Sequence, residues 1–453
     1  MSTPNNHTNT LSELKQEIAS SYGSEFQTHI TKAWSEIIHE LSQVTESISR
    51  KGSEYIPQVN FSELSSLSPE RLDEIRRIGT VVIKDVVDDQ EARAWQESLK
   101  GFIKANPDVP GFPANNKQFF ELYWTKPQVE ARSHPNVLAA STWLNNLYRN
   151  SSPSSEKTME GVDLSTPLTY ADRFRIRHPG GGWASFPPHV DGGSIERWQD
   201  SAFRSCFDDI LSGNWRKHDP YALNGRLEAR SSLYHRANQA SVFRTFQGWL
   251  AMSETAPTEG TLKVFPDVLL SNAYIILRPF FRPLVSVDSA EILDPNNWSY
   301  DISYADFPGI YPKDGGFAGP WPTSESHPHL MLHKTMISVP KVMPGDTVFW
   351  HCDVVHSVEV DHTGQEDSAV MYIPAVPTTP MNKAYVEKQK ECFLKSINPP
   401  DFPKGSQAFY GISRTAEDLL SAAGVHAMGL SVASSISSKR SKDRNIDLVC
   451  LSD

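Results

Sequence analysis

The stretch Pro344-Gly-Asp-Thr-Val-Phe-Trp-His-Cys-Asp-Val-Val-His-Ser357 decides the fold of this chain. Pro344-Gly345 is typical of a tight turn. The apolar run that follows predicts a strand, because it is short, β-branched and aromatic. The chain then delivers His356 on the next turn or strand. This segment therefore predicts a β structure that carries an imidazole close to a strand end.

A second segment, Phe186-Pro-Pro-His-Val-Asp-Gly-Gly193, places a histidine and an aspartate two residues apart. In a strand, residues i and i+2 lie on the same face, so His189 and Asp191 point the same way. Such a pair is common by chance, but His356 supplies a third ligand in the expected context. Two imidazoles and one carboxylate form the facial triad of mononuclear iron(II) oxygenases. We therefore predict that His189, Asp191 and His356 are the metal ligands and the catalytic centre.

Strand patterns surround both segments. Short β-branched or alternating runs occur at 79–85, 170–177, 242–252, 260–265, 335–339, 346–350 and 369–373. The 25 glycines and 32 prolines favour many short strands over a helical bundle. Helical spacing is present at 11–48, and acidic residues at 88–91 suit a helix N-terminus. We expect a mainly β fold with helical decoration, in the α+β class.

The 453 residues are enough for a large core and fit one decorated β domain. We predict an N-terminal helical extension at 1–60 and a main domain at 61–427, with insertions at about 195–240 and 270–330. The Ser- and Lys-rich segment 428–453 is predicted to be poorly ordered. A partner-binding coiled coil is the alternative for the N-terminal helices, although no heptad is sustained.

Bulk composition excludes several classes of protein. A net charge of −11 argues against nonspecific nucleic-acid binding. The four cysteines are far apart and form no CxxC, which argues against a disulfide framework and predicts a reducing compartment. The polar N-terminus and the lack of any apolar stretch of about 18 residues predict no signal segment and no membrane span. We expect a cytoplasmic enzyme with a small-molecule substrate; its oligomeric state is left open.

Six segments together resemble one enzyme group. They are Gly79–Ile83, Arg177–Gly181, His189–Asp191, Trp249–Met252, Glu259–Pro266 and Pro344–Ser357. They resemble the phytanoyl-CoA hydroxylase-like branch of the Fe(II)/2-oxoglutarate-dependent oxygenases. They are more similar still to a related family of fungi and bacteria that is catalogued as a domain of unknown function. The resemblance covers roughly residues 70–390.

This resemblance implies a fold, cofactors and ligands. The fold is a double-stranded β-helix, a jelly-roll or cupin-like barrel with the iron at its mouth. The implied cofactors are Fe(II), 2-oxoglutarate and O2, with ascorbate as an optional reductant. His189, Asp191 and His356 match the family's metal ligands one by one. The triad leaves half of an octahedral coordination sphere open for the oxo acid and dioxygen.

The sequence departs from this family pattern at one point. Most such enzymes carry an arginine or lysine soon after the distal histidine, where it binds the distal carboxylate of 2-oxoglutarate. The stretch 357–376 holds no arginine or lysine and offers Ser368 and Tyr372 instead. Because a buried dianion needs a cationic partner, we look elsewhere. The candidates are Arg175, Arg177 and Arg244, with Arg173 and Lys263 as weaker ones. One alternative is that these arginines are ordinary surface charges. Another is that the enzyme uses a different oxo acid or no oxo acid at all.

Other tempting residues receive plainer interpretations. We read His351 as a strand neighbour and Cys352 as a small buried hydrophobe. His327, His329 and His333 could bind zinc, but their loop-like surroundings favour a scattered surface set. We expect the carboxylates of Asp353, Asp361, Glu366 and Asp367 to be solvated. Trp183 and Phe186 are core residues or pocket-lining residues near the histidine and aspartate pair.

The sequence thus favours an Fe(II)/2-oxoglutarate-dependent dioxygenase, an oxidoreductase that hydroxylates, desaturates or cyclises a small metabolite. The substrate could be an amino acid or an intermediate of secondary metabolism. Asp191 argues against halogenation, because related halogenases leave the carboxylate position to chloride. The alternative is a non-catalytic or zinc-binding jelly-roll sensor or binding protein. A scaffold that acts through its N-terminal helices is the third hypothesis.

Overall fold

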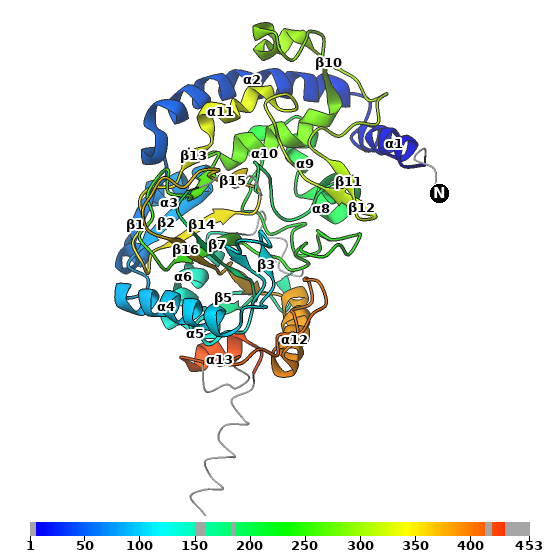
Figure 1. Cartoon of the computed structure of the whole chain (residues 1–453). Coiled ribbons are helices and arrows are strands. Elements are labelled where there is room, and N and C mark those ends of the chain that lie inside the picture. Colours follow the sequence, from blue (N-terminus) through cyan, green and yellow to red (C-terminus); the bar gives the residue numbers. More distant parts are fainter. Residues whose placement is uncertain (1–5, 150–158, 181, 183–185, 413–418, 431–453) are drawn as a thin grey trace, which may run out of the picture.

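Helices and strands both contribute heavily to this chain, as the computed structural model shows (Figure 1). It describes residues 6–149, 159–180, 182, 186–412 and 419–430, so most of the predicted tail and Trp183 lie outside the described residues. About 40% of the described residues are helical and about 18% are in strands. The fold is therefore α+β, and the expectation of a mainly β chain was wrong in its proportions.

The largest sheet has eight strands and is mainly antiparallel. Its order is β1 (Gln58–Asn60), β2 (Thr80–Lys84), β14 (Thr347–His351), β7 (Phe246–Ala251), β16 (Ser368–Tyr372), β6 (Phe174–Arg177), β4 (Phe119–Phe120) and β3 (Gly111–Phe112). Only the β1–β2 pair in it is parallel. β7 and β14 are buried along their whole length, as expected for central strands covered on both faces.

A smaller antiparallel sheet carries the end of the decisive sequence segment. Its order is β13 (Ile337–Ser338), β8 (Leu262–Val264) and β15 (His356–Val358). Gly345 turns the chain into β14 at a φ of 85°, and a Cβ there would lie 2.0 Å from the Val87 carbonyl oxygen, so only glycine fits. The chain then passes from β14 in the large sheet to β15 in the small one. Consecutive residues therefore connect the two sheets beside His356.

The described residues also form three two-stranded sheets. They pair β5 (Asp163–Leu168) with β17 (Val376–Thr378), β9 (Phe281–Pro283) with β10 (Trp298–Tyr300), and β11 (Tyr311–Lys313) with β12 (Gly316–Ala318). The β9–β10 and β11–β12 pairs belong to the segment expected to be an insertion at 270–330.

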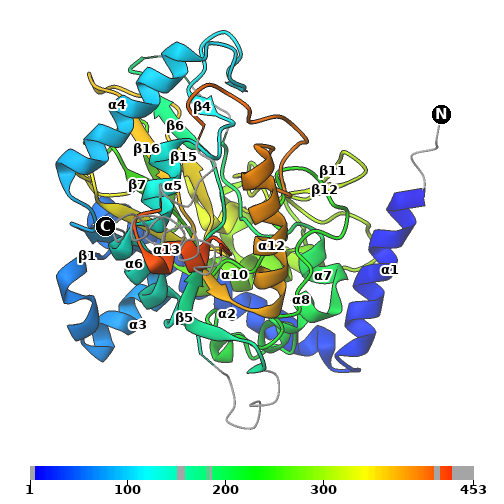
Figure 2. The same ribbon diagram turned by 90° about the horizontal axis from the view of Figure 1, so that it is seen from below.

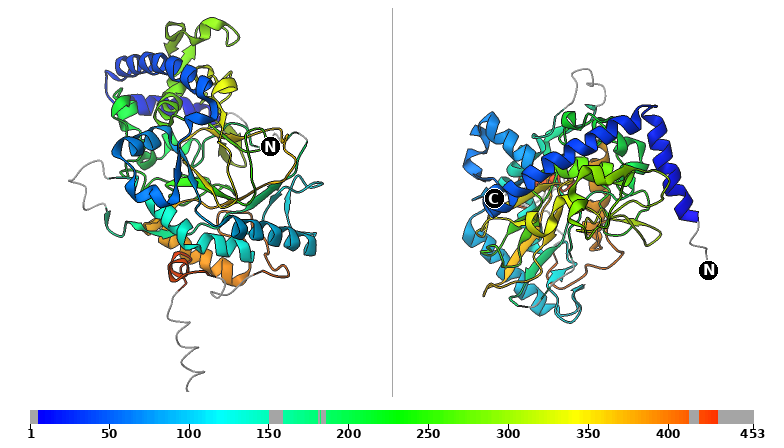
Figure 3. Two further views of the ribbon diagram at one scale, coloured as in Figure 1. Left: turned by 90° about the vertical axis from the view of Figure 1, so that its left-hand side faces the viewer. Right: turned by 90° about the horizontal axis from the view of Figure 1, so that it is seen from above.

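Helices cover the sheets from two sides (Figures 1 and 3). One side carries α2 (Phe26–Lys51), α10 (Val268–Leu277) and α11 (Leu332–Thr335); the opposite side carries α4 (Asp89–Ala105), α5 (Lys126–Ser133), α12 (Pro380–Lys395) and α13 (Ala422–Ala427). The view from below shows α12 and α13 beside each other (Figure 2). The other helices are α1 (Asn6–Ser21), α3 (Pro69–Ile78), α6 (Pro135–Asn145), α7 (Glu196–Gln199), α8 (Ser201–Ser205) and α9 (Asp208–Leu211).

The N-terminal helices pack against the main body of the protein. The Trp34 ring of α2 stacks on Tyr274 of α10 at 5.1 Å and on Phe281 of β9 at 4.5 Å. Such a buried aromatic cluster contributes both apolar area and specific ring geometry. α2 is therefore part of the same hydrophobic core as the sheets. Within the described residues, no helix has both the length and the apolar character that crossing a lipid bilayer requires.

Candidate metal centre

His189 and His356 are held side by side by the backbone. The His189 amide donates to the His356 carbonyl at 2.9 Å, and the His356 amide donates to the His189 carbonyl at 2.9 Å. This antiparallel bridge attaches the 189 segment to β15 at the edge of the small sheet. Their imidazole rings lie 4.1 Å apart. Two histidines that are 167 residues apart in sequence thus share one place in the fold.

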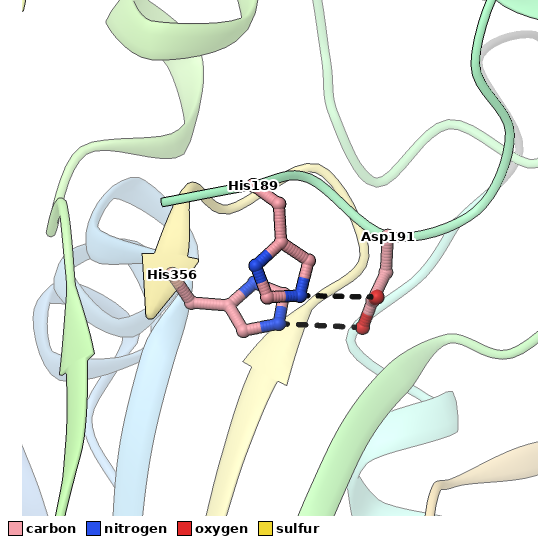
Figure 4. A group of neighbouring side chains, drawn as sticks. All are labelled: His189, Asp191 and His356. Carbon is pink, nitrogen blue, oxygen red and sulfur yellow. Dashed lines mark ion pairs between the residues drawn. The ribbon is translucent and has the colours of Figure 1, made fainter. Parts of the chain in front are cut away.

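Asp191 faces both imidazoles (Figure 4). Its carboxylate oxygens lie 3.5 Å from His356 Nε2 and 3.9 Å from His189 Nε2. One ligand atom from each residue lies within 4.8 Å of the other two. An ion bound about 2.1 Å from each ligand atom would need only small side-chain movements from this arrangement. The donor set of two imidazoles and one carboxylate suits iron or zinc.

Hydrogen bonds fix which ring nitrogen is available on each histidine. His189 Nδ1 lies 2.7 Å from the Pro187 carbonyl oxygen, and His356 Nδ1 lies 3.1 Å from that of Val354. A carbonyl oxygen can only accept, so each neutral ring carries its proton on Nδ1. The lone pairs are then on the Nε2 atoms that face Asp191. This is the usual way in which a second partner orients a metal-binding histidine.

The protonation states also suit a cation. Burial and, to a smaller extent, the neighbouring His189 lower the pKa of His356 to about 4, against the opposing effect of Asp191. Burial raises the pKa of Asp191, but His356, Arg244, His189 and Arg197 together outweigh burial and bring it below its usual value. At neutral pH the site therefore presents a neutral His356 imidazole and an ionised carboxylate, the forms that bind metal.

A cavity of about 110 Å³ opens in front of the three side chains. Arg173, Arg175 and Tyr372 line it, together with Phe186 and Trp249. Arg175 lies on β6 opposite Val370 of β16, and it donates to the Gly260 carbonyl at 3.0 Å. Arg173 forms an ion pair with Asp172 at 2.9 Å. The structure therefore brings two of the predicted arginines and the predicted tyrosine to the cavity.

The other four predicted residues do not line this cavity, and one of them, Lys263, lines a neighbouring space. Arg177 donates to the backbone carbonyls of Glu359 and Val360. Arg244 donates to Gln247 Oε1 at 3.0 Å, and Gln247 in turn lines the cavity. Ser368 is buried and accepts a hydrogen bond from Thr255 at 3.4 Å. Arg177, Arg244 and Ser368 thus lie outside the cavity lining, and their role in binding the oxo acid stays a prediction.

The alternative that the arginines are ordinary surface charges is wrong. Arg175 is 2% exposed and Arg177 is 1% exposed. The alternation of β6 does separate Phe174 and Ile176 from the arginines, but both faces of the strand are covered. Phe174 stacks on Phe120 of β4 at 5.1 Å, while the arginine face lies inside the protein. The arginine face of β6 is therefore a polar surface inside the protein and is not exposed to solvent.

A buried ion cluster beside the centre escaped sequence reasoning. The Asp353 carboxylate lies 2.7 Å from Arg197 and 2.6 Å from Arg226, and all three side chains are at most 5% exposed. The prediction of a solvated Asp353 was therefore wrong. Arg197 also donates to the backbone carbonyl of Asp191 at 2.7 Å. One guanidinium thus connects the segment that carries Asp191 to the turn that leads to His356.

The second histidine cluster is also not where the sequence placed it. His327 and His329 are 0% and 4% exposed, so the expected surface set holds only for His333. His329 Nδ1 hydrogen-bonds the Tyr274 hydroxyl at 2.8 Å, and His327 Nδ1 hydrogen-bonds Ser326 at 2.8 Å. Within the ranges that the structure describes, His189, Asp191 and His356 form the one group of three suited to a metal ion. His351 is buried beside Tyr148, as a strand neighbour should be.

Fold and site together define an α+β protein with a candidate mononuclear His-Asp-His metal centre at the meeting point of two sheets. The chain belongs to the Gig2-like family, which it matches over residues 6–430. This confirms the resemblance to a family catalogued as a domain of unknown function, since a solved member, GlcNAc Inducible Gene 2 (DUF1479) from Candida albicans, is 31% identical. The alignment covers 93% of this chain and 89% of that one, with a TM-score of 0.80.

Bacterial relatives extend over the same length. The uncharacterized protein YbiU of Escherichia coli (strain K12) is 29% identical over 414 residues, which are 88% of this chain and 91% of YbiU. A solved structure from Salmonella typhimurium LT2, provisionally described as an oxidoreductase, is 27% identical with a TM-score of 0.78. The alignment covers 95% of this chain and 99% of the Salmonella chain. The architecture is thus shared over at least 93% of the chain with solved fungal and bacterial proteins.

Proposed function

We propose that this protein is an Fe(II)- and 2-oxoglutarate-dependent oxygenase that oxidises a C–H bond of a small molecule. The main support for this proposal is that two imidazole Nε2 atoms and an ionised carboxylate converge at the wall of one cavity. Arginine side chains line the same cavity. The oxidoreductase description of the Salmonella relative supports the same class of reaction. Hydroxylation, desaturation and ring closure are all compatible with a retained Asp191 carboxylate.

We further propose that the two sheets form a double-stranded β-helix. The transition from β14 to β15 places consecutive strands in different sheets, and the 189–356 bridge adds the ligand-bearing segment to the small sheet. In such a core the ligands come from strand ends at one opening. His189, Asp191 and His356 occupy this kind of position, at the small-sheet edge and beside the cavity.

In this proposal the metal and 2-oxoglutarate supply an oxidative decarboxylation that drives C–H oxidation. The protein's part is to hold the metal, to orient its ligands and to exclude water from the cavity. His189, Asp191 and His356 would hold Fe(II), with the backbone carbonyls of Pro187 and Val354 orienting the rings. The aromatic rings of Trp249 and Phe186 would keep the cavity dry on the sides they line.

Arg175 is the residue we propose for the distal carboxylate of 2-oxoglutarate. Most enzymes of the resembled branch carry this cation on the strand after the distal histidine, which is β16 here. Arg175 lies beside that strand, opposite Val370, and reaches the metal cavity. Tyr372 of β16 lines the same cavity and could donate its hydroxyl to the carboxylate. A neighbouring strand would thus replace the missing cation of β16.

Uncoupled turnover tests the proposed function without knowledge of the substrate. Protein purified without metal and loaded anaerobically with Fe(II) is expected to form succinate from 2-oxoglutarate on addition of O2, as measured by chromatography. Zn(II)-loaded and metal-free protein are the controls and should form none. Tight metal binding with no succinate from the Fe(II)-loaded protein would instead favour the zinc-binding sensor.

The variant Arg175→Met tests the oxo-acid site. Loss of one charge-assisted contact is expected to raise the 2-oxoglutarate concentration for half-maximal succinate formation by about thirtyfold, since such a contact contributes about 2 kcal/mol. Arg175→Lys should recover part of the affinity, because it keeps the charge but loses the bidentate geometry. A folded Arg175→Met protein with unchanged dependence on 2-oxoglutarate would exclude Arg175 from this role.

A further inference from the structure

A large groove lies next to the metal cavity and is lined mainly by apolar side chains. Its volume is about 640 Å³, within the usual range for small-molecule sites. Its walls come from the segments on either side of the metal ligands and from the 311–336 region: Phe186, Pro187, Pro188, Val358, Val360, Tyr311, Trp321, Leu332 and Met336. Phe186 and Val358 line both the groove and the metal cavity. The two spaces are therefore neighbours that meet at these two side chains.

The small sheet separates the two spaces elsewhere. Leu262 of β8 lines the metal cavity, whereas the next residue, Lys263, lines the groove. Successive strand residues point to opposite faces. The groove thus runs along the outer face of the sheet that carries His356, and Phe186 and Val358 stand between it and the metal cavity.

Two large apolar side chains of the groove are exposed to solvent. Tyr311 is 44% exposed and Val360 is 51% exposed, and both are among the large apolar side chains with the greatest exposure. The Tyr311 and Trp321 rings lie 5.9 Å apart and form an aromatic wall. Contiguous exposed apolar surface of this kind commonly marks a binding site. Flat rings on one wall suit a planar or aromatic ligand.

Two basic side chains face this apolar space. Lys263 and His333 both line the groove. Within the described part of the chain, neither has a carboxylate within 4.0 Å. Lys263 is partly buried, and no carboxylate of the described residues balances its charge. A ligand anion at this point would supply the missing partner.

We propose that this groove binds the substrate, and that the substrate is an aromatic carboxylate. Its ring would pack against Trp321, Tyr311 and Phe186, and its carboxylate would bind Lys263 and His333. A reactive carbon could then reach the metal cavity past Phe186 and Val358, the two residues common to both spaces. This inference rests on the proposed oxygenase function for the fate of the ligand, but the binding itself requires no metal.

Binding of matched probes to metal-free protein tests the proposal. The probes are 1-naphthoate and 1-naphthylmethanol, which share a ring system and differ in charge, and equilibrium dialysis gives their Kd values. We expect naphthoate to bind about tenfold more tightly than the alcohol. Lys263→Met should weaken naphthoate binding about tenfold and leave the alcohol unchanged. Lys404→Met, at an exposed lysine outside the groove lining, is the matched control.

A second variant tests the location independently of charge. Ser324 is exposed and lines the groove, so Ser324→Trp should fill part of it without disturbing the core and should weaken both probes. Equal affinity for the two probes, or wild-type naphthoate binding in Lys263→Met, would overturn the proposal. Probe binding as expected in a protein that forms no succinate would refute the oxygenase function and leave the groove assignment standing.

Discussion

Replacing Asp191 with alanine is expected to abolish Fe(II) binding at the candidate centre and, with it, succinate formation. Asp191 is the only anionic member of the group of three, and its carboxylate faces both Nε2 atoms. Without it, only two imidazoles remain, and they bind a hard divalent cation far more weakly. We expect the Fe(II) affinity to fall at least about a hundredfold, since even indirect partners contribute about ten- to hundredfold. Succinate formation should fall in parallel.

Anaerobic titration with Fe(II) and chromatographic assay of succinate measure the two effects separately. Asp361→Ala is the matched control, because Asp361 is an exposed carboxylate and its loss changes the net charge equally. The control should keep both properties. An Asp191→Ala protein that binds Fe(II) as well as the wild type, or that still forms succinate, would show that the three side chains are not the metal centre.

The local part of this centre was predictable because short stretches of sequence determine its geometry. His189 and Asp191 point to one place, as their spacing predicted, although they lie in an irregular segment with one bridge at His189 and not in a strand. The turn at Gly345 follows from a backbone that only glycine allows. The strands at Thr80–Lys84, Thr347–His351 and Ser368–Tyr372 were also predictable, because short runs of β-branched and aromatic residues fit a pleated, buried surface.

What could not be predicted depends on pairing between distant segments. Asp353 finds its partners 156 and 127 residues away, and no local pattern distinguishes it from a solvated aspartate. Arg175 follows the alternation typical of a half-exposed strand, yet the face it occupies lines a cavity. His327 and His329 lie in a Pro-containing loop that reads as exposed, but packing under α2 buries them. The periodicity of a sequence predicts which way a side chain points, but it does not predict which other segments cover that side chain.

Asparagine in place of Asp353 is expected to lower the free energy of unfolding by about 3–5 kcal/mol, because breaking a buried ion cluster leaves uncompensated charge in the core. Arg197 and Arg226 would lose their shared counter-ion while remaining buried. Because Arg197 also donates to the Asp191 carbonyl, the Fe(II) affinity is expected to fall about tenfold as well. Urea unfolding and anaerobic Fe(II) titration measure these effects, with Asp361→Asn as the exposed control.

The same substitution should change how stability depends on pH. Burial raises the pKa of Asp353, but Arg226 and Arg197 outweigh burial and hold it far below its usual value. In the unfolded chain Asp353 has an ordinary aspartate pKa of about 3.9. As the pH falls, the unfolded chain therefore takes up a proton at a higher pH than the folded protein does. This carboxylate stabilises the fold fully above about pH 5, and that contribution is lost progressively as the pH falls. The difference in unfolding free energy between wild type and Asp353→Asn should therefore be constant from pH 6 to 8 and shrink below about pH 4. A difference that is small at neutral pH, or that grows with acid, would mean that Asp353 does not hold the two arginines in the way its distances indicate.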